Sequence, residues 1–172
     1  GQVMDFALAQ RLDEIAPFHV MEVIKRAAEL EKAGRSTIYM CIGEPDFPPP
    51  QPVLDAASRA LADGAAMRYT AALGLAELRE AISGHYRTAF GVEVPAERIV
   101  VTAGASAALL LACAALVERD AEVLMPDPSY PCNRHFIAAF NGHAKLIPSG
   151  PAERFQLSAQ AVDAPWSARP RG

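Results

Sequence analysis

Apolar residues recur at every third or fourth position between Phe18 and Lys32, and charged residues occupy the positions between them. This period is that of an amphipathic helix, and Gly34 just beyond it predicts where the helix ends. The next stretch, TIYMCIGEPDFPPPQP, starts as a short apolar strand and runs into five prolines. Because proline cannot continue a helix or a central strand, this stretch predicts an ordered loop or an extended connection.

Helix-like and strand-like patterns continue along the rest of the chain. Pro52 suits the first turn of a helix that stops at Gly64, and LAELREAISGHYRTAFG predicts another helix that ends at Gly91. The pattern then alternates through strand 98–102, helix 106–117, strand 122–125, helix 130–140 and strand 143–148. Strands separated by helices of this length belong to crossover connections, so the sequence predicts an α/β fold with a mostly parallel sheet, flanking helices and an N-terminal helical segment.

Composition narrows the class of protein. The chain has 172 residues, of which 51% are hydrophobic, and this is enough for one ordinary domain with a buried core. The formal net charge is -4, and no cluster of basic residues mixed with aromatics occurs. Nucleic-acid binding therefore has little support, and small-molecule chemistry or a protein partner is favoured.

Cysteine and histidine spacing gives no sign of a disulfide framework or a metal site. The three cysteines are far apart, which suggests a reducing, cytoplasmic setting, and the four histidines form no zinc-binding pair. No signal peptide is expected in the charged first twenty residues. Residues 99–117 carry no charge, but Gly104 interrupts them, so a strand, a turn and a buried helix are expected rather than a membrane span.

The stretch VTAGAS lies where the predicted strand 98–102 gives way to a helix. Ligands of open α/β sheets bind beyond the carboxyl ends of the strands, where helix N-termini also point. Gly104 permits a tight turn there, and the free amides of Ala105 and Ser106, with the Ser106 hydroxyl, would stabilise an anion such as phosphate. An ordinary serine at a helix N-terminus remains the alternative.

Tyr130 follows the next predicted strand, in the stretch MPDPSYP. The same topology brings this loop to the same edge of the sheet, so the ring would lie near whatever the Gly104 turn holds. An ordinary half-buried loop tyrosine is the alternative reading of this position.

Four motifs occur together in one order: IGEPDF at 42–47, YTAALGLAELREAI at 69–82, VTAGASAALLLA at 101–112 and DAEVLMPDPSYP at 120–131. With these motifs the chain resembles the N-terminal part of class I/II aminotransferases, which are fold-type I enzymes that depend on pyridoxal 5'-phosphate. The resemblance runs from about Ile15 to the tail. The forms of the motifs are most similar to the prokaryotic subgroup of aspartate, alanine and aromatic transaminases.

The resemblance assigns roles to five residues. It implies that Gly43 lies against the substrate carboxylate, that Ala105 and Ser106 donate to the cofactor phosphate, and that Tyr130 stacks on the pyridine ring. Tyr69 matches the tyrosine that reaches the phosphate bound by the other subunit of a homodimer. No metal is implied.

The resemblance also implies two domains and a substrate class. Residues 1–45 would contribute to a small domain, and residues 46–172 would form the first part of the large, cofactor-binding domain. The substrates would be an amino acid and a 2-oxo acid, and neither a membrane nor a nucleic acid would be involved.

The resemblance requires a Schiff-base lysine that this chain does not show. Its three lysines, Lys25, Lys32 and Lys145, do not lie in the Ser-Lys setting typical of the family. We therefore expect an N-terminal fragment of a longer aminotransferase, inactive alone and with no catalytic residue of its own. One alternative is a non-catalytic module that binds phosphate or pyridoxal phosphate. Another is an unrelated α/β nucleotide-binding domain, although GxGxxG and GxxxxGK[ST] are both absent.

Overall fold

The computed structural model describes residues 7–64 and 67–166 and divides into two compact units. One unit joins the described residues up to Tyr39 with those from Ala105 onward, and we call it the strand unit. The other runs from Met40 to Gly104, and we call it the helical unit. Each unit is described by itself.

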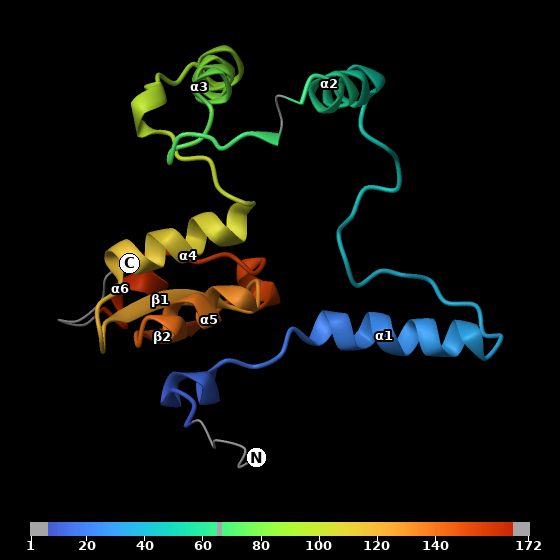
Figure 1. The fold of residues 1–172 in the computed structure, drawn as a ribbon. Helices are drawn as coiled ribbons and strands as arrows, with labels where there is room; N and C mark the ends of the chain where they lie inside the picture. The colour runs from blue at the N-terminus through green and yellow to red at the C-terminus, as the bar shows by residue number, and fades with distance from the viewer. Residues whose placement is uncertain (1–6, 65–66, 167–172) are drawn as a thin grey trace, which may run out of the picture. The chain divides into compact units, whose positions relative to one another are not determined.

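The strand unit holds the sheet. Its elements in chain order are η1 (Gln10–Glu14), α1 (His19–Lys32), α4 (Ala105–Leu116), β1 (Glu122–Asp127), α5 (Cys132–Ala139), β2 (His143–Pro148), η4 (Pro151–Glu153) and α6 (Ala159–Asp163). Strands β1 and β2 pair in parallel, in a register that runs from Glu122 opposite His143 to Asp127 opposite Pro148. Helix α5 makes the crossover between them and packs against β2, η1 and α4 (Figure 1). The predicted α/β fold with a parallel sheet is confirmed.

A small apolar core holds this crossover together. Its buried residues are Ala121, Ile137, Ala138 and Ile147. The turn from α5 into β2 needs glycine at 142, because a Cβ there would lie 2.5 Å from Cγ1 of Val117 and 3.2 Å from the carbonyl oxygen of Ala121. The close approach lets the amide of His143 donate to the carbonyl of Ala121 at 2.8 Å, which starts the pairing of the two strands.

The tail of the strand unit is attached to the sheet by Lys145. Its ammonium group donates to the carbonyl of Pro165 at 2.9 Å and lies 3.9 Å from the carboxylate of Glu122. Ser158 caps α6, because its hydroxyl accepts a hydrogen bond from the amide of Ala161 at 3.1 Å.

The helical unit consists of α2 (Gln51–Ala62), α3 (Ala76–Phe90) and η3 (Ala96–Arg98). Helix α3 ends at Gly91, whose φ of 67° is the left-handed C-terminal conformation that glycine adopts most easily. Helix α3 contacts η3, and one guanidinium nitrogen of Arg79 donates to the carbonyl of Ala96 at 3.0 Å. The two helices and Gly91 match the predicted elements.

The strand expected at 98–102 is not formed. Residues 96–98 make a 3-10 turn, and Ile99 is extended, but no described residue pairs with this segment in a ladder. The amide of Val101 instead donates to the carbonyl of Leu73 at 3.0 Å. Apolar β-branched residues favour extended backbone, but a strand also needs a neighbour to satisfy its hydrogen bonds, and the described residues offer none here.

The helix expected over 130–140 begins later, at Cys132. Pro131 stands at its N-cap, and the carbonyl of Tyr130 accepts from the amide of Asn133 at 3.2 Å. This leaves Tyr130 on the loop between β1 and α5 rather than on the helix.

In the part of the chain that the structure covers, none of the helices combines the length and the apolar character needed to cross a membrane.

Candidate functional site

The N-terminus of α4 has the features of an anion site. The helix begins at Ala105, its first turn has no acidic residue, and Ala105 and Ser106 are both exposed. In any α-helix the first four amides lack an intrahelical acceptor, and the aligned peptide dipoles make this end positive. The amides of Ala105 and Ser106 and the Ser106 hydroxyl can therefore donate to a phosphate.

Tyr130 lies beside this helix end. The side chains of Ser106 and Cys132 lie close enough to the phenol of Tyr130 to change its pKa. The ring of Phe18 packs edge-on against the ring of Tyr130, with 6.1 Å between the ring centroids and 69° between the planes. About half of Tyr130, 50%, stays exposed, so its ring is available to a flat ligand. We call Phe18, Ser106, Tyr130 and Cys132 the tyrosine cluster. The structure thus brings two of the predicted site residues, Ser106 and Tyr130, together.

The tyrosine cluster shifts the acidity of its phenol. The Cys132 thiol raises the pKa of Tyr130 above its ordinary value of 10.0, desolvation acts in the same direction, and the Ser106 hydroxyl acts in the opposite direction. The protonated phenol is therefore the form that the folded chain favours, and at neutral pH Tyr130 is an uncharged ring with a hydroxyl.

Replacing Cys132 with alanine (C132A) should lower the pKa of Tyr130 toward its ordinary value, because it removes the first cause of the shift. Since the folded pKa is raised, the stability that Tyr130 contributes is complete below its unfolded pKa and is lost as pH rises through the folded value. The measurement is tyrosinate absorbance against pH, with the Tyr130 signal identified by its loss in Y130F. C41A, in the helical unit, is the control, and an unchanged titration in C132A would contradict the prediction.

Gly43 and Tyr69 lie in the helical unit. Gly43 is exposed, and a Cβ built on it would meet nothing within 4 Å. Tyr69 is fully exposed, at 107% of the reference area. The helical unit therefore leaves both positions accessible.

Two members of the cluster were missed in the sequence. Cys132 follows Tyr130 by two residues, and this proximity was a signal that could have found it. Phe18 stands in the sequence only as the start of the α1 pattern, and nothing in that pattern links it to Tyr130. Their contact depends on tertiary structure alone.

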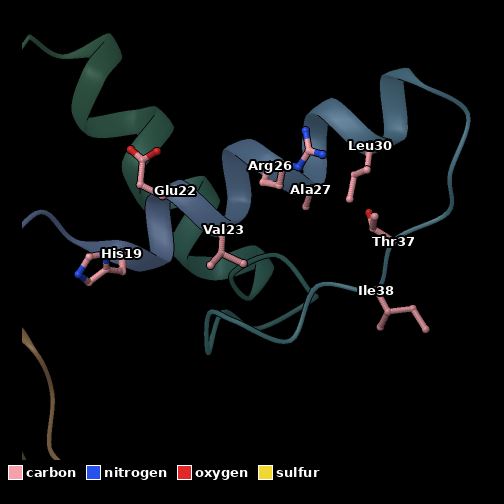
Figure 2. Close-up of a pocket in the computed structure, with 8 residues that line it drawn as sticks. All are labelled: His19, Glu22, Val23, Arg26, Ala27, Leu30, Thr37 and Ile38. Carbon is pink, nitrogen blue, oxygen red and sulfur yellow. The ribbon is translucent and has the colours of Figure 1, made fainter.

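A separate groove of about 600 Å³ runs along α1 (Figure 2). The hydroxyls of Thr37 and Tyr39 donate to the carboxylate of Glu31 and so tie the chain after α1 back to the helix. These two hydrogen bonds, that from Thr37 first, lower the pKa of Glu31. Apolar side chains such as Val23 and Leu30 line the groove, and neither Ser106 nor Tyr130 is among its lining residues.

The described residues offer no obvious centre for a metal ion or for covalent catalysis by lysine. No group of three or more His, Cys, Asp or Glu among them is arranged to hold a metal. Lys25 and Lys32 are exposed on α1, and Lys145 is engaged by Pro165 and Glu122. Lys25 and Lys32 are thus surface charges, and Lys145 attaches the tail to the sheet.

Comparison with known proteins places this geometry in a family. The family model of aminotransferase class I and II matches residues 35–170. The chain is 36% identical over 130 residues to (5-formylfuran-3-yl)methyl phosphate transaminase of Methanocaldococcus jannaschii, covering 76% of this chain and 35% of that protein. It is 37% identical over 148 residues to valine–pyruvate aminotransferase of Mycobacterium tuberculosis, covering 86% of this chain and 38% of that protein.

Solved structures agree with these matches. The crystal structure of an aminotransferase from M. tuberculosis superposes with a TM-score of 0.87 at 35% identity, over 95% of this chain and 42% of that one. Aspartate aminotransferase of Thermus thermophilus with maleate gives 0.89 at 29% identity, over 96% of this chain and 43% of that one. The chain thus spans less than half the length of these relatives.

These matches decide between the readings of the sequence. The resemblance that the four motifs indicated is confirmed, and so is the fold class, because the matching structures are fold-type I aminotransferases. The alternative of an unrelated nucleotide-binding domain is wrong, since the family model covers most of the chain. The chain belongs to the family of class I and II aminotransferases.

Proposed function

We propose that this chain supplies the phosphate and ring contacts of an aminotransferase that uses pyridoxal 5'-phosphate. The observation that carries the proposal is the position of Ser106 beside Tyr130 at the start of α4. A phosphate donor and a half-exposed aromatic ring at one helix end suit a ligand that is both a phosphate ester and a flat ring. The residues present therefore fit the cofactor.

Each residue has a defined task in this proposal. The amides of Ala105 and Ser106 and the Ser106 hydroxyl hold the phosphate, and Tyr130 lies against the pyridine ring. When bound, pyridoxal phosphate supplies the chemistry by which an amino group leaves an amino acid and reaches a 2-oxo acid. Because the phenol of Tyr130 stays protonated at neutral pH, its ring adds no charge that would repel the phosphate.

Other parts of the proposal rest on the family. We assign Gly43 to the substrate carboxylate and Tyr69 to the phosphate of a partner subunit, so that a homodimer builds each complete site. The full exposure of Tyr69 leaves its phenol free to reach such a partner. The division into a small-domain part, 1–45, and a large-domain part, 46–172, stays a prediction, as do a cytoplasmic location and the kinds of amino acid and 2-oxo acid.

We assign no catalytic residue to the described chain. Lys145 is occupied by a carbonyl and a carboxylate, and Lys25 and Lys32 lie on exposed positions of α1. The 172 residues alone should therefore bind the cofactor without transferring an amino group. This prediction coincides with the second candidate, a non-catalytic module that binds pyridoxal phosphate, so binding and transfer have to be measured separately.

The test is equilibrium dialysis of the purified chain against pyridoxal phosphate, pyridoxal and inorganic phosphate. We expect saturable binding of pyridoxal phosphate, at least about tenfold weaker binding of pyridoxal, because hydrogen bonds to a charged group are worth about 1.5–3 kcal/mol, and displacement by inorganic phosphate. Inorganic phosphate also serves as the control for nonspecific attachment of pyridoxal phosphate to lysines, because it would not displace pyridoxal phosphate that is attached in this way.

Two outcomes would contradict the proposal. Equal binding of pyridoxal and pyridoxal phosphate would show that the start of α4 holds no phosphate. Amino transfer from aspartate or alanine to a 2-oxo acid by the 172 residues alone would show that a catalytic group had been overlooked.

A further inference from the structure

The contact between Phe18 and Tyr130 joins parts of the strand unit that are far apart in the sequence. Phe18 is the N-cap of α1, and Tyr130 lies on the loop between β1 and α5. Their rings are T-shaped, with centroids 6.1 Å apart and planes at 69°, which is within the favourable range for aromatic pairs. The N-terminal segment thus reaches the residue to which the proposed function assigns the cofactor ring.

The backbone on both sides of this contact is held by hydrogen bonds. The carbonyl of Phe18 accepts from the amide of Met21 at 3.0 Å, as α1 begins. The carbonyl of Tyr130 accepts from the amide of Asn133 at 3.2 Å, as α5 begins. The backbone of each residue is therefore held just where a helix begins, and the freedom that remains to Tyr130 is mainly that of its side chain.

Phe18 and the other two members of the tyrosine cluster contact different parts of Tyr130. The side chains of Ser106 and Cys132 act at the phenol end, whereas Phe18 packs against the ring itself. Because half of Tyr130 is exposed, the loss of Phe18 would leave the ring held mainly at its hydroxyl and free to tilt. A ligand that stacks on the ring would then have to order it on binding, which costs affinity.

We propose that Phe18 is a positioning residue that sets the plane of Tyr130 for the cofactor ring. The inference rests on the proposed function, since Tyr130 matters to the cofactor only if the cofactor binds there. It adds a role for the segment before α1 that the motifs do not assign: this segment takes part in cofactor affinity through an aromatic contact, without touching the cofactor itself.

The experiment compares Phe18→Leu with Phe18→Tyr in the 172-residue chain. Leucine keeps an apolar side chain but removes the ring, and tyrosine keeps the ring. Phe90→Leu is the matched control, because Phe90 also makes T-shaped and tilted ring contacts, with His85 and Tyr86, but in the helical unit. Far-ultraviolet circular dichroism verifies that each variant keeps its helices.

Two properties are measured. The first is affinity for pyridoxal phosphate by dialysis, which should fall about 2- to 10-fold in F18L, the range that corresponds to one aromatic pair, and return with F18Y. The second is the ring resonance of Tyr130 in the cofactor-free chain, with ¹³C-labelled tyrosine and Y130F for assignment. It should move in F18L toward the position of an unpacked tyrosine, and F90L should change neither property.

The outcomes separate the two levels of the proposal. If the wild-type chain binds no pyridoxal phosphate, the proposed function fails. If the wild-type chain binds it and F18L binds it equally tightly, only the role of Phe18 is overturned. An unmoved Tyr130 resonance in F18L also overturns that role, because Phe18 would then not order the ring.

Discussion

Replacing Ile137 with alanine (I137A) is expected to remove a large share of the stability of the strand unit. Ile137 is 3% exposed, and α5, which carries it, contacts β2, η1 and α4. Truncating a buried isoleucine to alanine costs about 2–5 kcal/mol. Whole domains are stable by only about 5–15 kcal/mol, and the described core of this unit holds just three other buried apolar residues, so the loss is a large share of the total.

The measurement for I137A is urea unfolding followed by circular dichroism. Ile38→Ala is the matched control, because Ile38 is 87% exposed and the same truncation there should change the free energy of unfolding by less than about 0.5 kcal/mol. I137A should also lose binding of pyridoxal phosphate, since the loop of Tyr130 is anchored between β1 and α5. Equal effects of the two substitutions would mean that α5 is not the centre of this core.

The second large effect is expected from Ser106→Asp, which should weaken binding of pyridoxal phosphate by about 100-fold or more. The substitution removes a donor to a charged group, worth about 1.5–3 kcal/mol, and places a carboxylate where the phosphate should lie. Folding should respond in the opposite direction. A negative charge in the first turn of a helix stabilises it by about 0.3–1 kcal/mol, so S106D should unfold at the same or a higher urea concentration.

The opposite effects of S106D on cofactor binding and on stability distinguish a binding role of Ser106 from a structural one. If Ser106 served only to start α4, replacing it with aspartate would not lower the stability of the chain, because aspartate is an equally good residue at a helix N-terminus. Ser158→Asp is the control: it makes the same change at the N-cap of α6 and should leave cofactor binding untouched. If S106D bound pyridoxal phosphate as tightly as the wild type, the assignment of the phosphate to the start of α4 would be wrong.

Much of the local structure could be predicted from the sequence. The period of apolar residues located α1 to within one residue of its start, and glycines at 64 and 91 marked the ends of α2 and α3 to within two residues. Strand β2 has the predicted bounds, and β1 extends two residues further than predicted. These features depend on contacts between near neighbours in the chain, which a local pattern records.

The strand expected at 98–102 shows where such a pattern stops being informative. Val100 and Val101 are suited to a strand, but strand formation depends on a second segment that accepts and donates the ladder hydrogen bonds. The hydrogen bond from Val101 goes to Leu73, in the loop before α3, and a composition-based reading of residues 98–102 contains no information about that residue.

The candidate site also has features that local sequence determines and features that depend on tertiary contacts. The sequence by itself determined the helix start at Ala105 and Ser106, because a glycine followed by a helix-forming run is a local signal, and its motifs determined the family. Only the tertiary structure decided that Phe18 packs on Tyr130 and that Cys132 raises the pKa of its phenol. Ring contacts and pKa shifts depend on distances in space, which the packing of α1, α4 and α5 sets and which residue order alone does not contain.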